Sequence, residues 1–465
     1  MTIRILRTSR SLLSLSLILI LMHATKPHAA ARQEQVDFSQ LDKVVIEELK
    51  ERNTPGAAVA IIQGDRVVYA KGYGVASVET GAPVTPDMLF RLGSTTKMFT
   101  AAALVTLAAR EKVKLDEPIG GYVKGLSPRL AQATAHHLLS NTSGMKDFAA
   151  PFISNDDEAL GRSVRTWKDD VFFTEPGKIN SYSSPGFWLS GLVIEEVGGK
   201  PYADMMDELI FKPVGMQRTT LRPLAAMTHP MALGHSVEGN SKPTVMRPLF
   251  NNTTMWPAGS IFSSVNDLSC FVIAMMNGGR VEGKQVLDPL VVSKLPAPHV
   301  LLPGETDAHY GYGLLRFNQR GVRVVMHGGF SRGYGSMIQM APEHRFAVIV
   351  VTNRSGETLN KTRTKALEMA LPLKAEESRP TTALTMSRAE LANYAGVYSH
   401  EPQLWEVIVK DDKLILKQDG VETALTKIGE HKFSLGASGG ELVFVPGDDG
   451  KIKYLFDGLY AAIRK

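Results

Sequence analysis

The spacing of apolar and polar residues predicts strands at both ends of a first domain and helices between them. Residues 57–63 and 66–73 are rich in Val, Ala and Ile, and Gly64-Asp65 separates them, which predicts a β-hairpin near the start of the fold. The run from 100 to 109 consists of helix-forming residues. Short β-prone runs return at 322–326, 336–340 and 346–352 and predict consecutive antiparallel strands.

This order of elements predicts an α/β (α+β) fold, in which both ends of the domain complete one antiparallel sheet and a helical region is inserted between them. Residues 374–385 are charged, contain proline and have few large apolar side chains, as is typical of a linker. Beyond this segment the pattern becomes one of short strands separated by turns rich in Asp and Gly. These runs, at 404–409, 413–417, 442–445 and 451–456, predict a small all-β domain.

Residues 1–31 have the three parts of a secretory signal peptide. Arg4, Arg7 and Arg10 form a basic start, residues 12–22 are an apolar stretch, and residues 29–31 are alanines suited to signal peptidase. The alternative is a membrane anchor, but the apolar stretch is well short of the ~20 residues that span a bilayer. We therefore predict cleavage, no stable membrane anchor afterwards, and a periplasmic or secreted protein.

The net charge of +5 does not indicate an anionic partner. Arg4, Arg7, Arg10 and Lys26, all in the predicted signal peptide, carry four of these excess charges. The rest of the chain is nearly neutral and has no basic tract that could follow a nucleic-acid backbone. We expect no nucleic-acid partner.

Cys270 is the single cysteine, so no intramolecular disulfide can form. It lies in an apolar stretch, which favours a buried inert thiol over a reactive one. No cluster of His, Cys, Asp and Glu has the spacing of a metal site, so we expect neither a metal nor a cofactor.

Ser94 and Lys97 form the first candidate for catalysis. A serine hydroxyl needs a neighbouring base, and two residues three apart at the start of a helix lie on one face. The alternative role for Ser94 is a helix N-cap. A second Ser-x-x-Lys match occurs at Ser143 and Lys146, but Gly144 makes that segment a turn, so context favours Ser94.

Two further motifs contain candidate residues. Tyr182, in Tyr182-Ser183-Ser184, precedes an apolar run with helical patterning and could share a proton with Lys97; its alternative is an ordinary packed tyrosine. His327 precedes Gly328 and Gly329, and glycines at the end of a strand allow a ligand or another backbone to come close. The alternative for His327 is a structural or surface histidine.

Taken in order, these motifs resemble the three active-site motifs of the class C β-lactamase and D-alanyl-D-alanine carboxypeptidase family. The segments around residues 137–144, 257–260 and 310–313 are also similar to that family, and the resemblance runs from about Phe38 to Leu371. The C-terminal strands, with Tyr394 to Tyr398, resemble the lipocalin-like β-barrel appended to some members. The resemblance implies an antiparallel sheet with helices on both faces, an all-helical region beside it and a small all-β barrel domain.

The resemblance also implies a role for each site residue. Ser94 would attack a carbonyl, and Lys97 and Tyr182 would manage its proton. The N–H groups of Ser94 and Phe330 would form the oxyanion hole. The remaining substrate-binding residues would be Ser184, His327, Gly328 and Gly329.

Two positions depart from the family pattern. Ser184 stands where Asn is usual, and a hydroxyl holds a substrate amide less firmly than a carboxamide does. His327 stands where β-lactamases of this class have Lys, and a neutral histidine offers a hydrogen-bond donor more than a fixed charge. Both changes favour peptidase or esterase activity over efficient β-lactam hydrolysis.

The resulting prediction is an exported serine hydrolase that works through an acyl-enzyme on D-amino-acid peptides or small esters, with weaker β-lactam hydrolysis. The alternative is a catalytically slow protein that binds or senses penicillin or peptidoglycan. The expected partners are small-molecule or peptide substrates, including peptidoglycan fragments. The predicted organisation is a signal peptide at 1–31, a hydrolase domain at 32–373, a linker at 374–388 and a β-barrel domain at 389–465.

Overall fold

The computed structural model describes residues 37–239, 241–376, 383–436 and 439–465. The predicted signal peptide lies outside these residues, as does part of the predicted linker. Residues Ser39–Lys465 form one compact unit. The predicted domain boundaries stay predictions.

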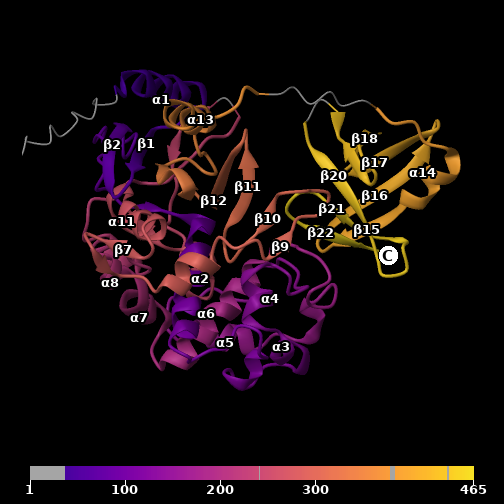
Figure 1. The fold of residues 1–465 in the computed structure, drawn as a ribbon, viewed down its shortest axis with the longest axis horizontal. Helices are drawn as coiled ribbons and strands as arrows, with labels where there is room; N and C mark the ends of the chain where they lie inside the picture. The colour runs from indigo at the N-terminus through magenta and orange to yellow at the C-terminus, as the bar shows by residue number, and fades with distance from the viewer. Residues whose placement is uncertain (1–36, 240, 377–382, 437–438) are drawn as a thin grey trace, which may run out of the picture. The chain divides into compact units, whose positions relative to one another are not determined.

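A sheet of eight strands organises the first part of this unit (Figure 1). Neighbouring strands pair in antiparallel fashion throughout, in the order β2-β1-β14-β13-β12-β11-β10-β9. The strands come from both ends of the domain, as predicted from the apolar runs. They are β1 (Gly56–Gln63), β2 (Arg66–Gly74), β9 (Val300–Leu301), β10 (His309–Tyr310), β11 (Leu315–Gln319), β12 (Val322–Ser331), β13 (Tyr334–Ala341) and β14 (Phe346–Thr352).

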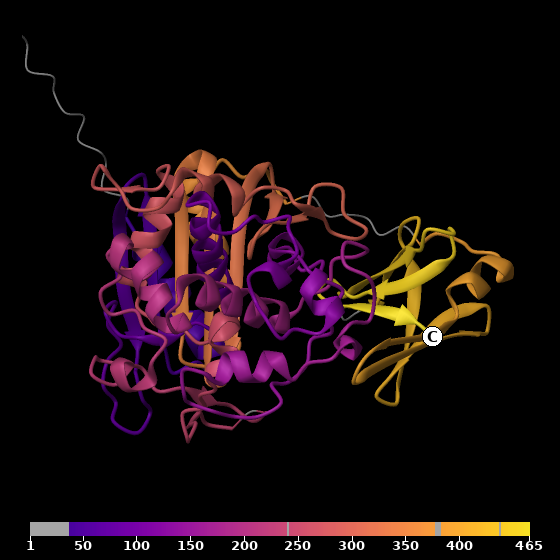
Figure 2. The same cartoon turned by 90° about the horizontal axis from the view of Figure 1, so that it is seen from below.

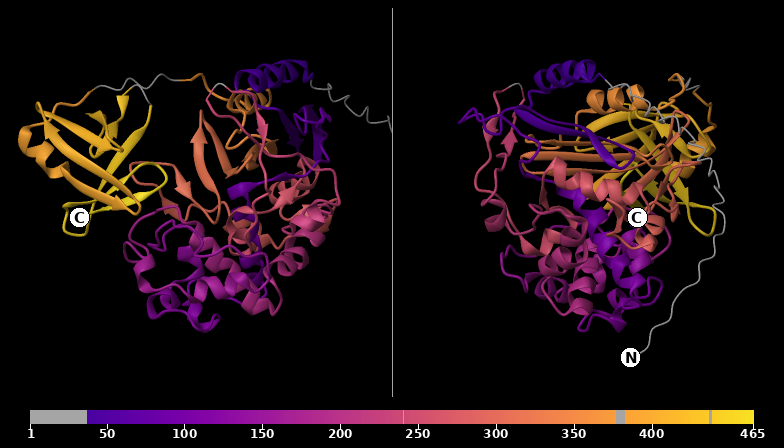
Figure 3. Two further views of the ribbon diagram at one scale, coloured as in Figure 1. Left: turned by 180° about the vertical axis from the view of Figure 1, so that it is seen from behind. Right: turned by 60° about the vertical axis from the view of Figure 1, so that its left-hand side comes forward.

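Strands β1 and β14 lie inside the sheet and are buried on both faces, so the sheet needs helices on each side. Ala58 and Ala60 of β1 join the main core together with Ile349 of β14, while the alternating Val59 and Val350 are buried as well. Helix α11 (Val265–Met276) packs against β1 and β14, and helices α1 (Ser39–Glu51) and α13 (Asn360–Ala370) lie over the sheet away from the helical region (Figure 3). The predicted sheet with helices on both faces is confirmed.

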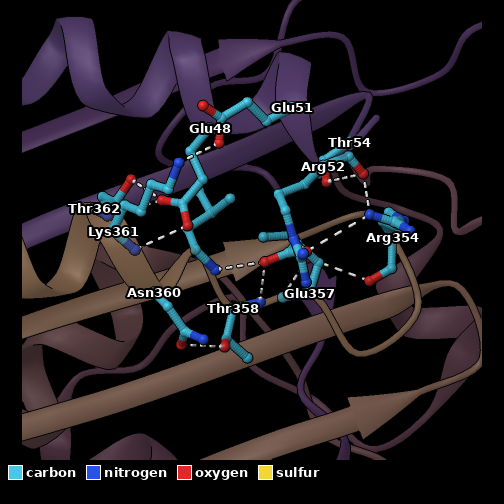
Figure 4. Close-up of polar contacts among 12 residues, drawn as sticks. Glu48, Glu51, Arg52, Thr54, Arg354, Glu357, Thr358, Asn360, Lys361 and Thr362 are labelled. Atoms are coloured by element: carbon cyan, nitrogen blue, oxygen red, sulfur yellow. Dashed lines mark hydrogen bonds and ion pairs between the residues drawn. The ribbon is translucent and has the colours of Figure 1, made fainter. Parts of the chain in front are cut away.

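Glu48 joins the first and last helices of this domain (Figure 4). Its side chain is buried, and its carboxylate accepts the N–H groups of Lys361 and Thr362 at 2.9 and 2.7 Å. These are orphan donors at the start of α13, where a negative charge also suits the helix dipole. The contact ties α1 to a helix more than three hundred residues further along the chain.

The inserted helical region lies below the sheet in Figure 1 and in front of the strands in Figure 2. Its centre is α2 (Thr96–Ala109), which is apolar on nearly all sides and packs against α6 (Ser184–Gly198) and α10 (Trp256–Gly259). The other helices are α3 (Pro128–Gln132), α4 (Ala135–Leu139), α5 (Ala159–Arg165), α7 (Tyr202–Met206), α8 (Lys212–Val214), α9 (Pro223–Ala226) and α12 (Pro289–Lys294). No helix in the described ranges is long and apolar enough to cross a membrane.

The C-terminal part forms a closed barrel, as the strand rhythm predicted. Helix α14 (Arg388–Tyr394) precedes it and begins with a capping box between Ser387 and Glu390. The barrel has its own apolar core, which includes Tyr398, Phe433 and Phe444. Its strands are β15 (Gly396–His400), β16 (Gln403–Lys410), β17 (Lys413–Gln418), β18 (Val421–Lys427), β19 (Lys432–Ser434), β20 (Glu441–Pro446), β21 (Ile452–Phe456) and β22 (Ala461–Arg464).

Candidate active site

Ser94 lies in a short 3-10 turn (Gly93–Thr95) that leads into α2. The Nζ of Lys97 donates a hydrogen bond to its Oγ at 3.2 Å. The N-cap of α2 is Thr95, so Ser94 does not cap the helix. The second Ser-x-x-Lys match is not a pair, because Lys146 forms an ion pair with Glu401 at 2.8 Å.

Lys97 is completely buried, and this burial lowers the pKa of its ammonium from 10.5 to about 7, against the opposing effect of the Asp147 charge. Its other hydrogen bonds in the described part of the chain go to the carbonyl of Ala258 at 3.0 Å and the Oγ of Ser184 at 3.4 Å. None of these partners is a carboxylate. The Lys97 ammonium therefore loses its proton far more readily than that of a free lysine, and the neutral amine can accept a proton.

Tyr182 contacts both Ser94 and Lys97. The Lys97 Nζ is 4.6 Å from the centre of the Tyr182 ring, and the Tyr182 hydroxyl forms a hydrogen bond with Ser94. Burial raises the pKa of Tyr182 well above 10, more than the hydrogen bond with Ser94 lowers it. The hydroxyl stays protonated at neutral pH and can donate a proton.

Ser184 begins α6, directly after Ser183, whose Oγ accepts the N–H of Gly186 as an N-cap. The Ser184 Oγ accepts a hydrogen bond from Lys97, while its N–H donates to Asp147 Oδ1 at 2.8 Å. Sequence reasoning did not find Asp147. No local pattern marks it, because its partners lie at residue 184 and beyond.

His327 on β12 faces the same site as a neutral ring. Burial, with a smaller effect from the nearby Lys97 charge, lowers the pKa of His327 to about 3. Its Nδ1 lies 2.7 Å from the carbonyl of Gly328 and must donate to it, so Nε2 is the acceptor facing the Tyr310 hydroxyl at 3.3 Å. The hydrogen-bond donor expected at this position is therefore already used within the protein.

Glycines allow two backbone segments to meet beside Ser94. A Cβ on Gly329 would come within 1.8 Å of the Leu92 carbonyl oxygen, and one on Gly93, whose φ is +55°, within 2.3 Å of the Phe330 carbonyl oxygen. Gly93 and Gly329 thus hold the chain before Ser94 directly against the end of β12. The Phe330 side chain points outward and is 66% exposed.

Gly93→Ala is expected to separate these segments. The new Cβ cannot fit beside the Phe330 backbone, and alanine is strained in the left-handed conformation of this position. We expect kcat to fall roughly 100-fold, the lower end of the loss seen when one oxyanion donor is removed. Initial rates with an activated ester measure this effect. Gly81→Ala is the matched control, because Gly81 also has a positive φ, of +68°, but open space around it. Equal losses in both variants would contradict the interpretation.

The predicted residues surround one pocket of about 700 Å³. Gly328 lies in its wall, and Lys97 lies beneath it, against Ser94 and Ser184. The lining comes from both parts of the compact unit, since the β21–β22 turn contributes Gly458, Leu459 and Tyr460. The pocket is lined by Ser94, Tyr182, Ser184, His327, Gly328, Gly329 and Phe330 among the predicted residues, and by Arg91, Asp147 and Arg332 among the charged ones.

Arg91 is a second buried cation that sequence reasoning did not assign. Its guanidinium donates to the Phe250 carbonyl and to Ser260 Oγ, the latter at 2.9 Å, and burial lowers its pKa to about 10. It forms no ion pair within the described residues. No group of three or more His, Cys, Asp or Glu side chains in those residues could hold a metal ion.

A serine and a buried lysine within hydrogen-bond distance, on this fold, are the groups expected of a serine hydrolase of the β-lactamase fold. The model of the β-lactamase family matches residues 41–370. The chain therefore belongs to the β-lactamase family, as the motifs indicated.

Characterised relatives and solved structures agree with this assignment. The chain is 28% identical over 428 residues to a D-aminopeptidase of Gluconobacter oxydans, covering 85% of this chain and 78% of the relative. It is 25% identical over 333 residues to the protein flp of Staphylococcus aureus, a match that covers 69% of this chain. The match spans 64% of the flp protein, which is less than two thirds of its length. The fold is similar to that of SurE with D-Leu, with a TM-score of 0.73 at 22% identity over 92% of this chain and 99% of SurE.

Proposed function

We propose that this protein hydrolyses D-amino-acid peptides or small esters through an acyl-enzyme on Ser94. The observation that carries the proposal is the 3.2 Å hydrogen bond between Ser94 Oγ and the buried Lys97 amine at the base of a 700 Å³ pocket. The amine has a pKa near 7, so it is available as a base at neutral pH. Such pairing of nucleophile and base is what a serine needs to attack a carbonyl.

In the proposed acylation, neutral Lys97 takes the proton of Ser94 as the Oγ bonds to the substrate carbonyl carbon. The N–H groups of Ser94 and Phe330 stabilise the resulting oxyanion. Tyr182 gives a proton to the departing amine or alkoxide, and Lys97 returns one to Tyr182. Water then attacks the acyl-enzyme with the same groups acting in reverse.

Several features favour D-amino-acid amides and esters over β-lactams. His327 is neutral and its ring nitrogens are engaged, so the third motif supplies no cation. Arg332 lines the pocket elsewhere, is exposed, and suits a substrate with a carboxylate. The D-aminopeptidase similarity, over most of both chains, points to the same substrate class. On this basis carboxypeptidase or aminopeptidase activity ranks first, esterase activity second and β-lactam hydrolysis last.

A second candidate function is a protein that binds peptidoglycan fragments or penicillin and acylates slowly. Ser184 favours it, because its hydroxyl is hydrogen-bonded to Lys97 at 3.4 Å and supplies no amide for a substrate. In that case intact mass would show a lasting adduct after penicillin treatment, without turnover.

A substrate panel distinguishes these functions. We expect the mature protein to hydrolyse p-nitrophenyl acetate and D-alanine p-nitroanilide, the L-anilide at least about tenfold more slowly, and nitrocefin most slowly. The release of nitrophenol, nitroaniline or opened β-lactam is followed by absorbance, with Ser94→Ala as the blank. An L-anilide faster than the D-anilide would contradict the D-amino-acid assignment and leave esterase activity.

We also propose export to the periplasm or the exterior, on the sequence of residues 1–31 alone. The mass of the N-terminal peptide from cells would show processing near Ala31 if the proposal holds. An intact N-terminus at Met1 would contradict it.

A further inference from the structure

A series of hydrogen bonds, linked through the backbone and side chain of Ser184, joins the C-terminal barrel to the proposed nucleophile. The Tyr460 hydroxyl donates to Asp147 Oδ2 at 3.0 Å, and Asp147 Oδ1 accepts the Ser184 N–H at 2.8 Å. The chain continues through the Ser184 Oγ to Lys97 at 3.4 Å and from Lys97 to Ser94 at 3.2 Å. One end of the chain is therefore a barrel residue and the other is the reacting hydroxyl.

The same barrel turn also holds the backbone of the tyrosine in the second motif. The Tyr182 N–H donates to the Leu459 carbonyl at 2.9 Å, and the Ala461 N–H donates to Ser181 Oγ at 3.0 Å. The ring of Tyr460 meets that of Tyr182 edge to face, with centroids 6.1 Å apart. Two points of attachment thus fix both the backbone and the ring of Tyr182.

Further hydrogen bonds stabilise the β21–β22 turn beside Tyr182. Asp457 Oδ1 accepts the N–H groups of Leu459 and Tyr460 at 2.9 and 2.7 Å, an arrangement that stabilises a tight turn. His400 on β15 donates from Nδ1 to the Ala461 carbonyl at 3.0 Å and accepts the Asp147 N–H at Nε2 at 3.4 Å. Asp457 therefore fixes the backbone of Tyr460, and His400 links the backbone of Asp147 to the start of β22.

We propose that Tyr460 and Asp147 are positioning residues, through which the β21–β22 turn of the barrel sets the protonation of Lys97 and the place of Tyr182. The inference rests on the proposed function of Ser94 and Lys97 and adds to it that the barrel is part of the catalytic centre. Asp147 contributes a negative charge close to Lys97, and the Tyr460 hydroxyl offsets part of that charge.

The effect of the Asp147 charge on the pKa of Lys97 has a predictable direction. A carboxylate near an ammonium favours the charged form, and the Asp147 charge indeed raises the pKa of Lys97 against the larger lowering by burial. Without the Tyr460 hydroxyl, the Asp147 carboxylate loses a hydrogen-bond donor that offsets part of its negative charge. The carboxylate then favours the ammonium form of Lys97 more strongly, so Lys97 should hold its proton to higher pH. Loss of the carboxylate charge should have the opposite effect. The other titratable groups around this cluster are Tyr182, Tyr310, His327 and His400, with Arg91 and Arg332 in the pocket wall.

Attachment of the barrel does not depend on Tyr460 alone. At another point of the same interface the Tyr454 hydroxyl and Thr174 Oγ1 are 2.6 Å apart, and Lys178 pairs with Asp448 at 2.8 Å. Tyr454 is a buried barrel tyrosine outside the pocket lining. Tyr454→Phe is therefore a matched control that removes one interface hydroxyl without touching the chain to Lys97.

The test is the pH dependence of kcat/KM in the full chain for wild type, Tyr460→Phe, Asp147→Asn and Tyr454→Phe. We expect the acid limb to move up by about half a pH unit in Tyr460→Phe and down by about one unit in Asp147→Asn. In Tyr460→Phe kcat should fall roughly 3- to 10-fold with a smaller change in KM, while Tyr454→Phe keeps the wild-type profile.

A second readout separates this inference from the proposed function. A fluorophosphonate forms a Ser94 Oγ–P bond and releases fluoride as the serine proton passes to the base. Mass spectrometry of the intact protein measures the rate of this labelling at each pH. Absent labelling of wild type would refute the proposed function. Wild-type labelling whose pH profile is identical in Tyr460→Phe, or is moved equally by Tyr454→Phe, would overturn the positioning role alone.

Discussion

Ser94→Ala is expected to abolish turnover, with a loss of about 10⁴-fold or more in kcat, while the protein stays folded. The hydroxyl is the atom that would bond to the substrate, and the rest of the pocket can supply only residual catalysis. The fold should tolerate the change, because Ser94 does not occupy the N-cap position of α2, which is Thr95. Ester hydrolysis measures the loss, and the thermal midpoint checks the fold.

Ser143→Ala is the matched control for this variant. Ser143 belongs to the other Ser-x-x-Lys match, and within the described residues its Oγ accepts only the local N–H of Met145, at 3.3 Å. We expect its activity to stay within about threefold of wild type. Unchanged turnover in Ser94→Ala would remove the basis of the serine hydrolase mechanism.

Lys97→Met is expected to cost about 10³- to 10⁴-fold in kcat/KM, because it removes the base and leaves Ser94 without an acceptor for its proton. In wild type, kcat/KM should rise through pH 7 as Lys97 loses its proton. Methionine matches lysine in length and is apolar, so it suits a fully buried position. The control is Lys146→Met, since Lys146 belongs to the other Ser-x-x-Lys match and pairs with Glu401. This variant should retain activity.

The same variant should be more stable than wild type in acid. The pKa of Lys97 is about 7 in the folded protein and 10.5 in the unfolded one, so the unfolded chain binds the proton more tightly. Burial of the charged ammonium lowers the free energy of unfolding by its full amount below pH 7, and this destabilisation disappears as the pH rises towards 10.5. Thermal midpoints at pH 6 and pH 9 should show a larger gain for Lys97→Met at pH 6. A larger gain at pH 9 would contradict the buried, easily deprotonated amine.

Local sequence patterns determined the elements and the first half of the site. The hairpin of β1 and β2 and the late strands followed from apolar runs and turn residues, because side-chain periodicity reports which faces are buried. Ser94 and Lys97 could be paired because residues three apart share one face of a helix. The order of three motifs along the chain then indicated the family, which the match to residues 41–370 confirms.

Only the tertiary structure decided which groups surround that pair and what protonation state they have. Asp147 and Tyr460 lie 313 residues apart and meet only when the barrel packs beside α6, so no local spacing could reveal them. The low pKa values of Lys97 and His327 come chiefly from removal of water, which depends on all the chain segments packed around each group. Residue type and spacing therefore identified the reacting groups, while burial by distant segments determined their charge.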